Sequence, residues 1–473
     1  MADILNSEPL GEAEAEALGR KAGPHRPASA LGQVSWAAFD GARSPYNVLV
    51  NIFVFSAYFT TVVIPDPVRG QELWSYITSG AALLVALGAP ILGAIADAGG
   101  RRKPWLAATV LLGVPCMILL WLATPGMTDG IGIVVAALVG AYLAFEYSAV
   151  FCNAMLPNIT TPNRIGFLSG LGFTLGNFFG ILLFFFFLAA WSWNPHPLLG
   201  LDAKMHEPER AVGILAGIWL AIFALPLFLF TPDSPSTARP VGEAVRTGIK
   251  TLLGTFAKAR SYRNVVMFLV ARMIFNEGFV VLMLFTGVFA AGILHWTPTM
   301  LIAEGLINSV VASLAGLLAG WVDTRFGSKK STMIFVAGCL LANLTLVSVT
   351  PGMVFFVPVT AADAPAWSSV GGIFPTLPDQ VFLVTQCFAA LCVTGGFATA
   401  RALMAKISPP DMLNEFFGLF AFSGTSTSFL GPLAIGLLTL AFANQRAGVA
   451  VGIVFLSVGL LLMFAVREPR LQS

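Results

Sequence analysis

The stretch GAIADAGGRRK, Gly93–Lys103, lies between two long apolar runs, Trp74–Ala96 and Trp105–Thr124. Each run is long enough to cross a bilayer as a helix. The basic residues Arg101–Lys103 end the stretch, and the positive-inside rule places such a turn in the cytoplasm. Asp97 ends the first run, where we expect its carboxylate to accept hydrogen bonds from free backbone amides of the turn.

A weaker copy of this stretch lies far downstream, also between two apolar runs. It consists of Gly316, Gly320, Asp323, Arg325, Gly327, Lys329 and Lys330. Two such turns at corresponding places predict two related halves, which is a common plan among transporters.

The composition is that of a membrane protein that crosses the bilayer many times. Of 473 residues, 57% are hydrophobic and 11% are charged, whereas a soluble chain carries about a quarter charged residues. A net charge of +2 gives no reason to expect a nucleic-acid partner. All five cysteines fall inside apolar runs, so we expect neither a disulfide framework nor a metal site, and no cofactor.

The apolar runs predict twelve transmembrane helices. They are Tyr46–Ile64, Leu73–Ala96, Trp105–Thr124, Ile131–Leu156, Ile165–Trp191, Ala211–Phe230, Val265–Leu294, Met300–Trp321, Thr332–Val349, Val381–Ile407, Phe416–Ala443 and Ala447–Val466. Basic residues support this assignment, because most of them fall on one side. The exceptions are Arg69, Lys204, Arg210, Arg446 and Arg272. Both termini are therefore predicted to be cytoplasmic.

The predicted fold class is all-α, with two pseudo-symmetric six-helix halves. A cytoplasmic tail is expected over 1–34, a first bundle over 35–230, a linker over 231–264, a second bundle over 265–466 and a C-terminal tail over 467–473. The linker contains apolar residues at helical spacing with basic residues between them, which predicts an amphipathic helix on the membrane surface. We expect a passive tether rather than a calmodulin target.

Several stretches carry a family resemblance. The G-x-x-x-D-x-x-G-R-R spacing resembles the cytoplasmic loop signature of the major facilitator superfamily. A narrower branch is indicated by SWAAFDGARSPY (Ser35–Tyr46), FEYSAVFCNAMLP (Phe145–Pro157), RIGFLSGLG (Arg164–Gly172), FLVARMIFNEG (Phe268–Gly278), ARALMAKISPP (Ala400–Pro410) and NEFFGLF (Asn414–Phe420). These are similar to the fungal vacuolar amino-acid effluxers and their bacterial relatives, the autophagy-linked permease group. The resemblance implies amino-acid transport, with export suggested.

Ionisable groups inside membrane spans are costly and are therefore functional candidates. The candidates for substrate binding or coupling, with neighbouring polar residues, are Glu277, Asn276, Arg272, Glu146, Asn177, Gln386, Glu304 and Asn308. Glu304 and Asn308 are four residues apart, so they share one helix face. Arg272 and Glu277 are expected either to serve transport or to neutralise each other, and Glu146 either bonds a neighbouring helix or titrates.

A second group is expected to gate or to move: Asp40, Arg43, Gly93, Asp97, Gly100, Arg101, Arg102, Gly176, Gly316, Gly320 and Asp323. Asp40 and Arg43 precede the first predicted span and are expected to pair at its cytoplasmic end. Glycines recur every four residues near Gly176 and at Gly316/Gly320, and such faces let helices approach closely. In the superfamily the fifth and eighth helices meet across the halves, which makes this face the expected rocking interface.

These features favour a secondary active transporter of a small polar metabolite working by alternating access, with amino acids implied by the resemblance and proton coupling left open. Alternatives are a sugar–cation symporter, a broad exporter, or a receptor or scaffold that does not transport. No enzymatic motif or P-loop is visible. We expect a monomer in the membrane lipid, in the inner membrane if the source is bacterial, with a small-molecule substrate, protons as an optional partner and no nucleic acid.

Overall fold

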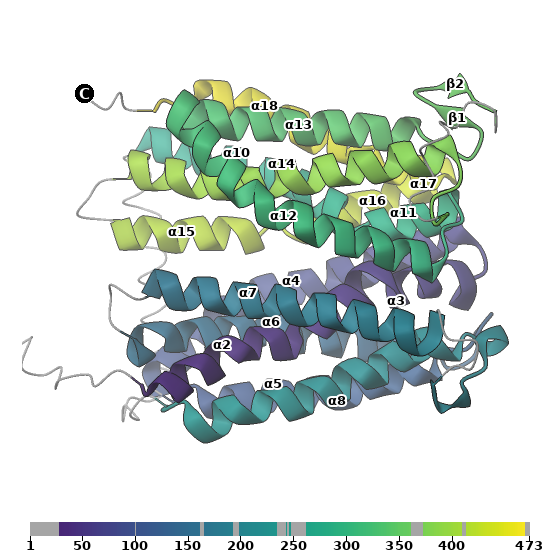
Figure 1. Ribbon diagram of the computed structural model, residues 1–473. Coiled ribbons are helices and arrows are strands. Elements are labelled where there is room, and N and C mark those ends of the chain that lie inside the picture. Colours follow the sequence, from purple (N-terminus) through teal and green to yellow (C-terminus); the bar gives the residue numbers. More distant parts are fainter. Residues whose placement is uncertain are drawn as a thin grey trace, which may run out of the picture.

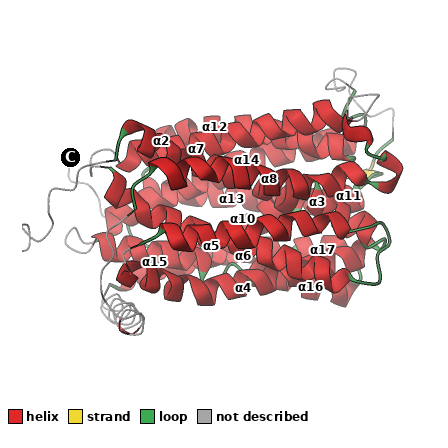
Figure 2. Ribbon diagram, turned by 90° about the horizontal axis from the view of Figure 1, so that it is seen from below, coloured by secondary structure: helices red, strands yellow, loops and turns green. Residues whose placement is uncertain are grey.

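The computed structural model describes residues 28–99, 101–160, 165–192, 198–233, 243, 246, 262–360, 372–408 and 413–468. This part of the chain is almost entirely helical (Figure 2). Twelve of its helical segments are long and apolar enough to cross a membrane, in agreement with the twelve predicted spans. A single short hairpin, β1 (Met353–Val354) with β2 (Val357–Pro358), is present in the described residues.

The first half carries six of these segments. Its elements are α2 (Ala30–Pro45), η1 (Tyr46–Phe53), α3 (Phe55–Tyr58), η2 (Phe59–Val63), α4 (Pro67–Gly99), α5 (Lys103–Leu119), η3 (Leu120–Leu122), α6 (Ile131–Ile159), α7 (Ile165–Phe187), η5 (Leu188–Ser192), η6 (Leu198–Gly200), η7 (Ala203–Met205) and α8 (Glu207–Phe230). The segments α2, η1, α3 and η2 follow one another and together form the first membrane span, Ala30–Val63. Within it, α-helical turns alternate with the π-helical turns of η1 and η2.

The second half carries the other six. Its elements are α10 (Arg263–Leu284), α11 (Thr286–Ile293), α12 (Pro298–Phe326), α13 (Ser328–Ser348), α14 (Leu377–Ile407), α15 (Leu413–Thr425), α16 (Leu430–Phe442), α17 (Gln445–Val449) and α18 (Val451–Ala465). Figure 1 shows the two halves lying side by side, with purple to teal helices in one and green to yellow helices in the other. In each half the first helix packs against the last, α2 against α8 and α10 against α18.

The two halves are tied together at the end of the molecule where α3, α11 and α17 lie, here called the α11 end (Figure 1). Gln71 donates to Thr439 Oγ1 at 2.8 Å and to the carbonyl of Gln445 at 3.0 Å. Gln445 in turn donates to the carbonyl of Pro67 at 2.9 Å. The same end has close backbone contact, because a Cβ added at Gly287 would lie 2.5 Å from the carbonyl oxygen of Ile52. This conformation is therefore closed at the α11 end.

The first helix corrects one sequence-based expectation. Asp40 and Arg43 were placed before the first span, but the helix begins at Ala30 and both residues lie inside it. Arg43 Nε donates to Asp40 Oδ1 at 3.1 Å, and Arg43 also donates to the carbonyl of Phe145 on α6 at 3.1 Å. Because the two charges neutralise each other, this polar part of the sequence packs within the bundle despite its low hydropathy.

Two predicted spans are broken helices. The seventh span was expected to run from Val265 to Leu294, but α10 ends at Leu284 and α11 begins at Thr286. The eleventh span divides into α15 and α16, with 426–429 between them. Hydropathy does not register such breaks, because the residues on both sides of each break are apolar.

The two halves share one feature that the sequence did not reveal: a carboxylate after the last helix of each half accepts hydrogen bonds from backbone amides at the start of the third helix. In the first half, Asp233 follows α8 and accepts from the backbone amides of Arg102 and Lys103 at 2.9 and 3.3 Å. In the second half, Glu468 follows α18 and accepts from the amides of Ser328 and Lys329 at 3.0 and 2.9 Å. A carboxylate thus satisfies the free amides at the start of the third helix in each half.

Gly100, the side chain of Asp97 and almost all of the predicted amphipathic helix in the linker lie outside the described residues. Gly93 is described, and no atom of the described residues lies within 4 Å of an added Cβ there. Gly88 instead allows the close approach of α6, because an added Cβ would overlap the Tyr147 hydroxyl.

Candidate functional site

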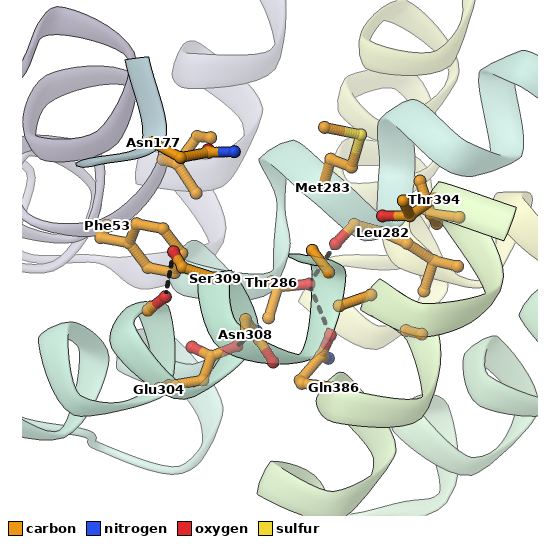
Figure 3. A pocket seen from close by; sticks show the side chains of 16 residues that line it. Phe53, Asn177, Leu282, Met283, Thr286, Glu304, Asn308, Ser309, Gln386 and Thr394 are labelled. Carbon is orange, nitrogen blue, oxygen red and sulfur yellow. Dashed lines mark hydrogen bonds between the residues drawn. The ribbon is translucent and has the colours of Figure 1, made fainter. Parts of the chain in front are cut away.

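A cavity of about 220 Å³ lies between the two halves (Figure 3). Residues of η1 and α7 contribute from the first half, and residues of α10, α11, α12 and α14 from the second. The lining consists of Ile52, Phe53, Asn177, Leu282, Met283, Thr286, Glu304, Gly305, Asn308, Ser309, Ala312, Gln386, Ala389, Ala390, Val393 and Thr394. The wall is mostly apolar, with a few polar groups that converge from three elements of the second half and from α7.

Glu304 and Asn308 form one polar corner of the cavity, as their spacing on one helix face predicts. Asn308 Nδ2 donates to Glu304 Oε1 at 3.0 Å. Glu304 is fully buried at 0% exposure, and its Oε2 has no hydrogen-bond partner in the described structure. The same holds for Asn308 Oδ1. The corner therefore presents two free acceptors.

Gln386 and Thr286 form a second polar corner, which lies beside Asn308 in Figure 3. Thr286 opens α11, just after the helix break at Phe285, and its hydroxyl lies 2.5 Å from the carbonyl of Leu282 and 3.3 Å from Gln386 Oε1. Gln386 is 3% exposed, and its Nε2 donor has no partner in the described structure. This corner therefore presents a free donor.

The charge of the cavity is one-sided. Among the described residues that line it, Glu304 is the only ionisable one, and none is Arg, Lys or His. Asn177 brings a neutral amide from α7 (Figure 3). Because the other lining groups are neutral, no protein cation in the lining neutralises the Glu304 carboxylate.

The structure separates Glu277 and Asn276 from this cavity and places them at the break in the eleventh span. Glu277 Oε2 accepts from the backbone amide of Gly431 at 2.8 Å, at the beginning of α16. Asn276 Nδ2 donates to the carbonyl of Gly424 at 3.3 Å, at the end of α15. The N-terminus of a helix carries free N–H groups and a partial positive charge, which suits the Glu277 carboxylate. The C-terminus carries free carbonyls and a partial negative charge, which suits the Asn276 donor.

Arg272 has its own partners and does not pair with Glu277. Its guanidinium donates to the carbonyl of Phe420 and to Ser423 Oγ, each at 2.6 Å, and lies 3.7 Å from the centre of the Phe420 ring. Both side chains are described, and no ion pair joins them. The expected alternative of mutual neutralisation is therefore wrong in this conformation, and the three residues brace α15 and α16 against α10.

Glu146 also lies away from the cavity lining. It is on α6, partly buried, next to Phe145, whose carbonyl accepts from Arg43 and whose ring lies 4.6 Å from the Arg43 guanidinium carbon. Its role stays a prediction.

The glycine face near Gly176 packs within the first half, which corrects the expected rocking interface. An added Cβ at Gly172 would lie 2.9 Å from Asp40 Oδ2, and one at Gly176 would lie 3.7 Å from Asp40 Cβ, so α7 presents these glycines to α2. Gly316 and Gly320 have no atom within 4 Å of an added Cβ. The fifth and eighth spans do meet, but elsewhere, where the Phe184 ring would lie 2.9 Å from a Cβ at Gly305.

Of the other expected gating residues, Asp323 forms an ion pair with Lys406 at 3.3 Å. Arg102 takes part in the Asp233 end structure through its amide, and Arg101 is exposed. Thr286 and Ser309 are cavity residues that the sequence did not indicate, because a hydroxyl in an apolar helix is commonplace and only the helix break directs Thr286 inward. Among the described residues, no three His, Cys, Asp or Glu side chains lie together as a metal site requires.

The family model and the similar sequences point to the same family of proteins. The family model described as "Vacuole effluxer Atg22 like" matches residues 163–472. An uncharacterized MFS-type transporter, YxiO, from Bacillus subtilis is 22% identical over 437 residues, which is 92% of this chain and 94% of that protein. Autophagy-related protein 22 from Cryptococcus neoformans is 24% identical over 290 residues, 59% of this chain and 47% of that protein. The chain thus matches about half the length of this fungal relative.

Solved structures agree on the fold. The nucleoside transporter NupG superposes with a TM-score of 0.64 at 13% identity, covering 92% of this chain and 98% of that one. A D-xylose–proton symporter gives 0.62 at 14% identity, covering 92% and 96%. At these identities the likeness concerns the twelve-helix architecture alone.

Proposed function

The chain belongs to the vacuole effluxer Atg22-like family of major facilitator transporters, and on that premise we propose that it moves a small polar solute through the cavity between its halves. One observation carries this proposal. Glu304 Oε2, Asn308 Oδ1 and Gln386 Nε2 are buried at one cavity without protein partners. Buried polar atoms are normally hydrogen-bonded, so partners missing from the protein are expected from a ligand.

The size of the cavity supports a small solute. Pockets for drug-sized ligands measure about 300–1,000 Å³, and this cavity is smaller, at about 220 Å³. Its mixture of apolar wall and amide groups suits a metabolite with an aliphatic part and a polar end. Amino acids, which the family resemblance implies, are of this kind, and the effluxer description of the family favours export.

The contacts between the halves support alternating access. The α11 end is closed by the Gln71 and Gln445 hydrogen bonds, and on the predicted orientation it faces outward. A transporter must break such contacts to open this end, while other contacts form at the opposite end. Polar contacts of this kind are suited to the task, because water replaces them when the end opens.

The experiment is transport by purified protein in liposomes with a panel of small polar solutes, combined with one cavity variant. Asn308→Leu places a branched apolar side chain in the polar corner and should abolish uptake. Ser313→Ala on the same helix is the matched control, since Ser313 is exposed and bonds only the carbonyl of Ser309.

If Asn308→Leu inserts and transports at the rate of Ser313→Ala, the cavity is not the transport site. If no solute in the panel moves although both proteins are folded, the proposal of a transported small metabolite fails as well.

A further inference from the structure

The cavity's charge and free hydrogen-bonding atoms define a ligand class, and this step rests on the proposed function. We infer that the solute is a monocation, a protonated primary amine that also carries a neutral acceptor oxygen, and that it competes with a proton for Glu304. The two polar corners point to this class of ligand, and so does the lack of a basic residue among the described lining residues.

The Glu304 carboxylate defines the first feature of the ligand, its positive charge. Burying an isolated carboxylate without a partner is prohibitively costly. The carboxylate of Glu304 is fully buried and bonded only by the Asn308 amide. The corner therefore needs one positive charge, and a protonated amine supplies it together with three N–H donors. Two of these donors find acceptors that are free, Glu304 Oε2 and Asn308 Oδ1.

The Gln386 corner defines the second feature of the ligand, its acceptor oxygen. Gln386 Nε2 is a buried donor with no partner in the described structure, so the ligand should bring an oxygen acceptor in addition to its amine. A carbonyl or hydroxyl oxygen satisfies it without adding charge. A ligand carboxylate also offers an acceptor, but it adds a negative charge, and the described lining residues include no Arg, Lys or His to neutralise it.

Charge therefore separates an amino acid from its amide. With the amide bound, Glu304 and the ligand sum to zero. With the amino acid bound, the cavity holds one net negative charge if Glu304 is ionised. If Glu304 keeps its proton, the ammonium group faces a neutral carboxyl and loses its charged partner in the corner. A buried uncompensated charge is expensive even when hydrogen-bonded, so the cavity should prefer the amide.

In the empty state, Glu304 still receives no positive charge from the described lining residues. A proton taken up from solvent then neutralises its carboxylate. Neighbouring ionisable groups offer little else, because none of the other lining residues on η1, α7, α10, α11, α12 or α14 is ionisable. The Cys387 thiol on α14 is near enough to interact electrostatically with Glu304, but it supplies no positive charge. Entry of the ammonium group then displaces the carboxyl proton to solvent, and the site exchanges one cation for the other.

The test uses purified full-length protein and three probes of the same shape: valinamide, valine and 3-methylbutanamide, which is valinamide without its amine. We expect valinamide to bind at least tenfold more tightly than either of the others. Titration calorimetry in buffers of different ionisation enthalpy should report about one proton released per valinamide bound. Glu304→Gln keeps the shape and an acceptor but should remove both the preference for valinamide and the proton release.

The inference is overturned if valine binds as tightly as valinamide, if binding releases no proton from the unmodified protein, or if Glu304→Gln retains the preference. Proton release is measured on the unmodified protein, so it stays decisive even if the variant is unstable. If none of the probes binds while another solute is transported and Asn308→Leu blocks it, the charge argument is wrong and the proposed function stands.

Discussion

Gly287→Ala should open the α11 end. An added methyl group would lie 2.5 Å from the carbonyl oxygen of Ile52, whereas ordinary contact begins at 3.4 Å, so α11 and η1 must move apart by about 0.9 Å. The atoms nearest to the added methyl group are backbone atoms of Ile52 and Phe53, so no side chain can rotate away to relieve the overlap. Overpacking of this kind costs about 1–3 kcal/mol. The cost falls on the closed conformation, because the two halves separate when this end opens.

This free-energy cost lowers the population of the closed conformation relative to the open one. Since about 1.4 kcal/mol is tenfold, the ratio of closed to open molecules should fall by about 5- to 150-fold. The measurement is the distance distribution between spin labels at Asp66 and Asn444, two exposed positions at the α11 end, in a chain whose native cysteines are replaced. Gly287→Ala should deplete the short-distance population.

Gly316→Ala is the control, because nothing lies within 4 Å of its added Cβ. It should leave the distribution unchanged. If Gly287→Ala gives the same distribution as Gly316→Ala, the close approach of α11 to η1 does not hold the closed state, and the reasoning is refuted.

Three further outcomes follow from the contacts described above. Combining Arg272→Met with Glu277→Gln should give the sum of the two losses in thermal stability, because the side chains share no ion pair; recovery in the double variant would contradict this. Glu468→Gln should speed hydrogen exchange at the two amides that it accepts from by about tenfold, because a charged acceptor is roughly twice as strong as a neutral one, and unchanged exchange would show that the contact adds nothing. Reporters fused after Ser473 and within 350–360 should lie on opposite sides of the membrane, as the basic residues predict; the same side for both would break the twelve-span arrangement.

The sequence predicted the number of spans because hydropathy and length decide it. Twelve apolar runs became twelve helical segments, and the Glu304/Asn308 pair was found from its helical spacing alone. Hydropathy failed where polar residues neutralise each other. Asp40 and Arg43 look like a cytoplasmic stretch by composition, yet their mutual bond and the bond from Arg43 to Phe145 let them pack inside the bundle.

Other features depend on contacts between distant parts of the chain. The spacing of glycines near Gly176 showed that a helix approaches closely, but not that the neighbour is α2 rather than α12. The link from Glu277 to Gly431 joins residues 154 positions apart. Nothing local to Glu277 predicts this contact with the beginning of α16, so only the fold could show it.

The carboxylates Asp233 and Glu468 bear on the order in which the chain folds during synthesis. Each belongs to the same half as the amides that it accepts from, so neither half needs the other to complete this structure. Domains generally fold as units, the N-terminal one first. The first half can therefore fasten the start of α5 as soon as Asp233 has left the ribosome. In the second half, the amides at the start of α13 gain their acceptor only after the twelfth span has been made, because Glu468 follows that span. Until then the second half packs its helices without this carboxylate.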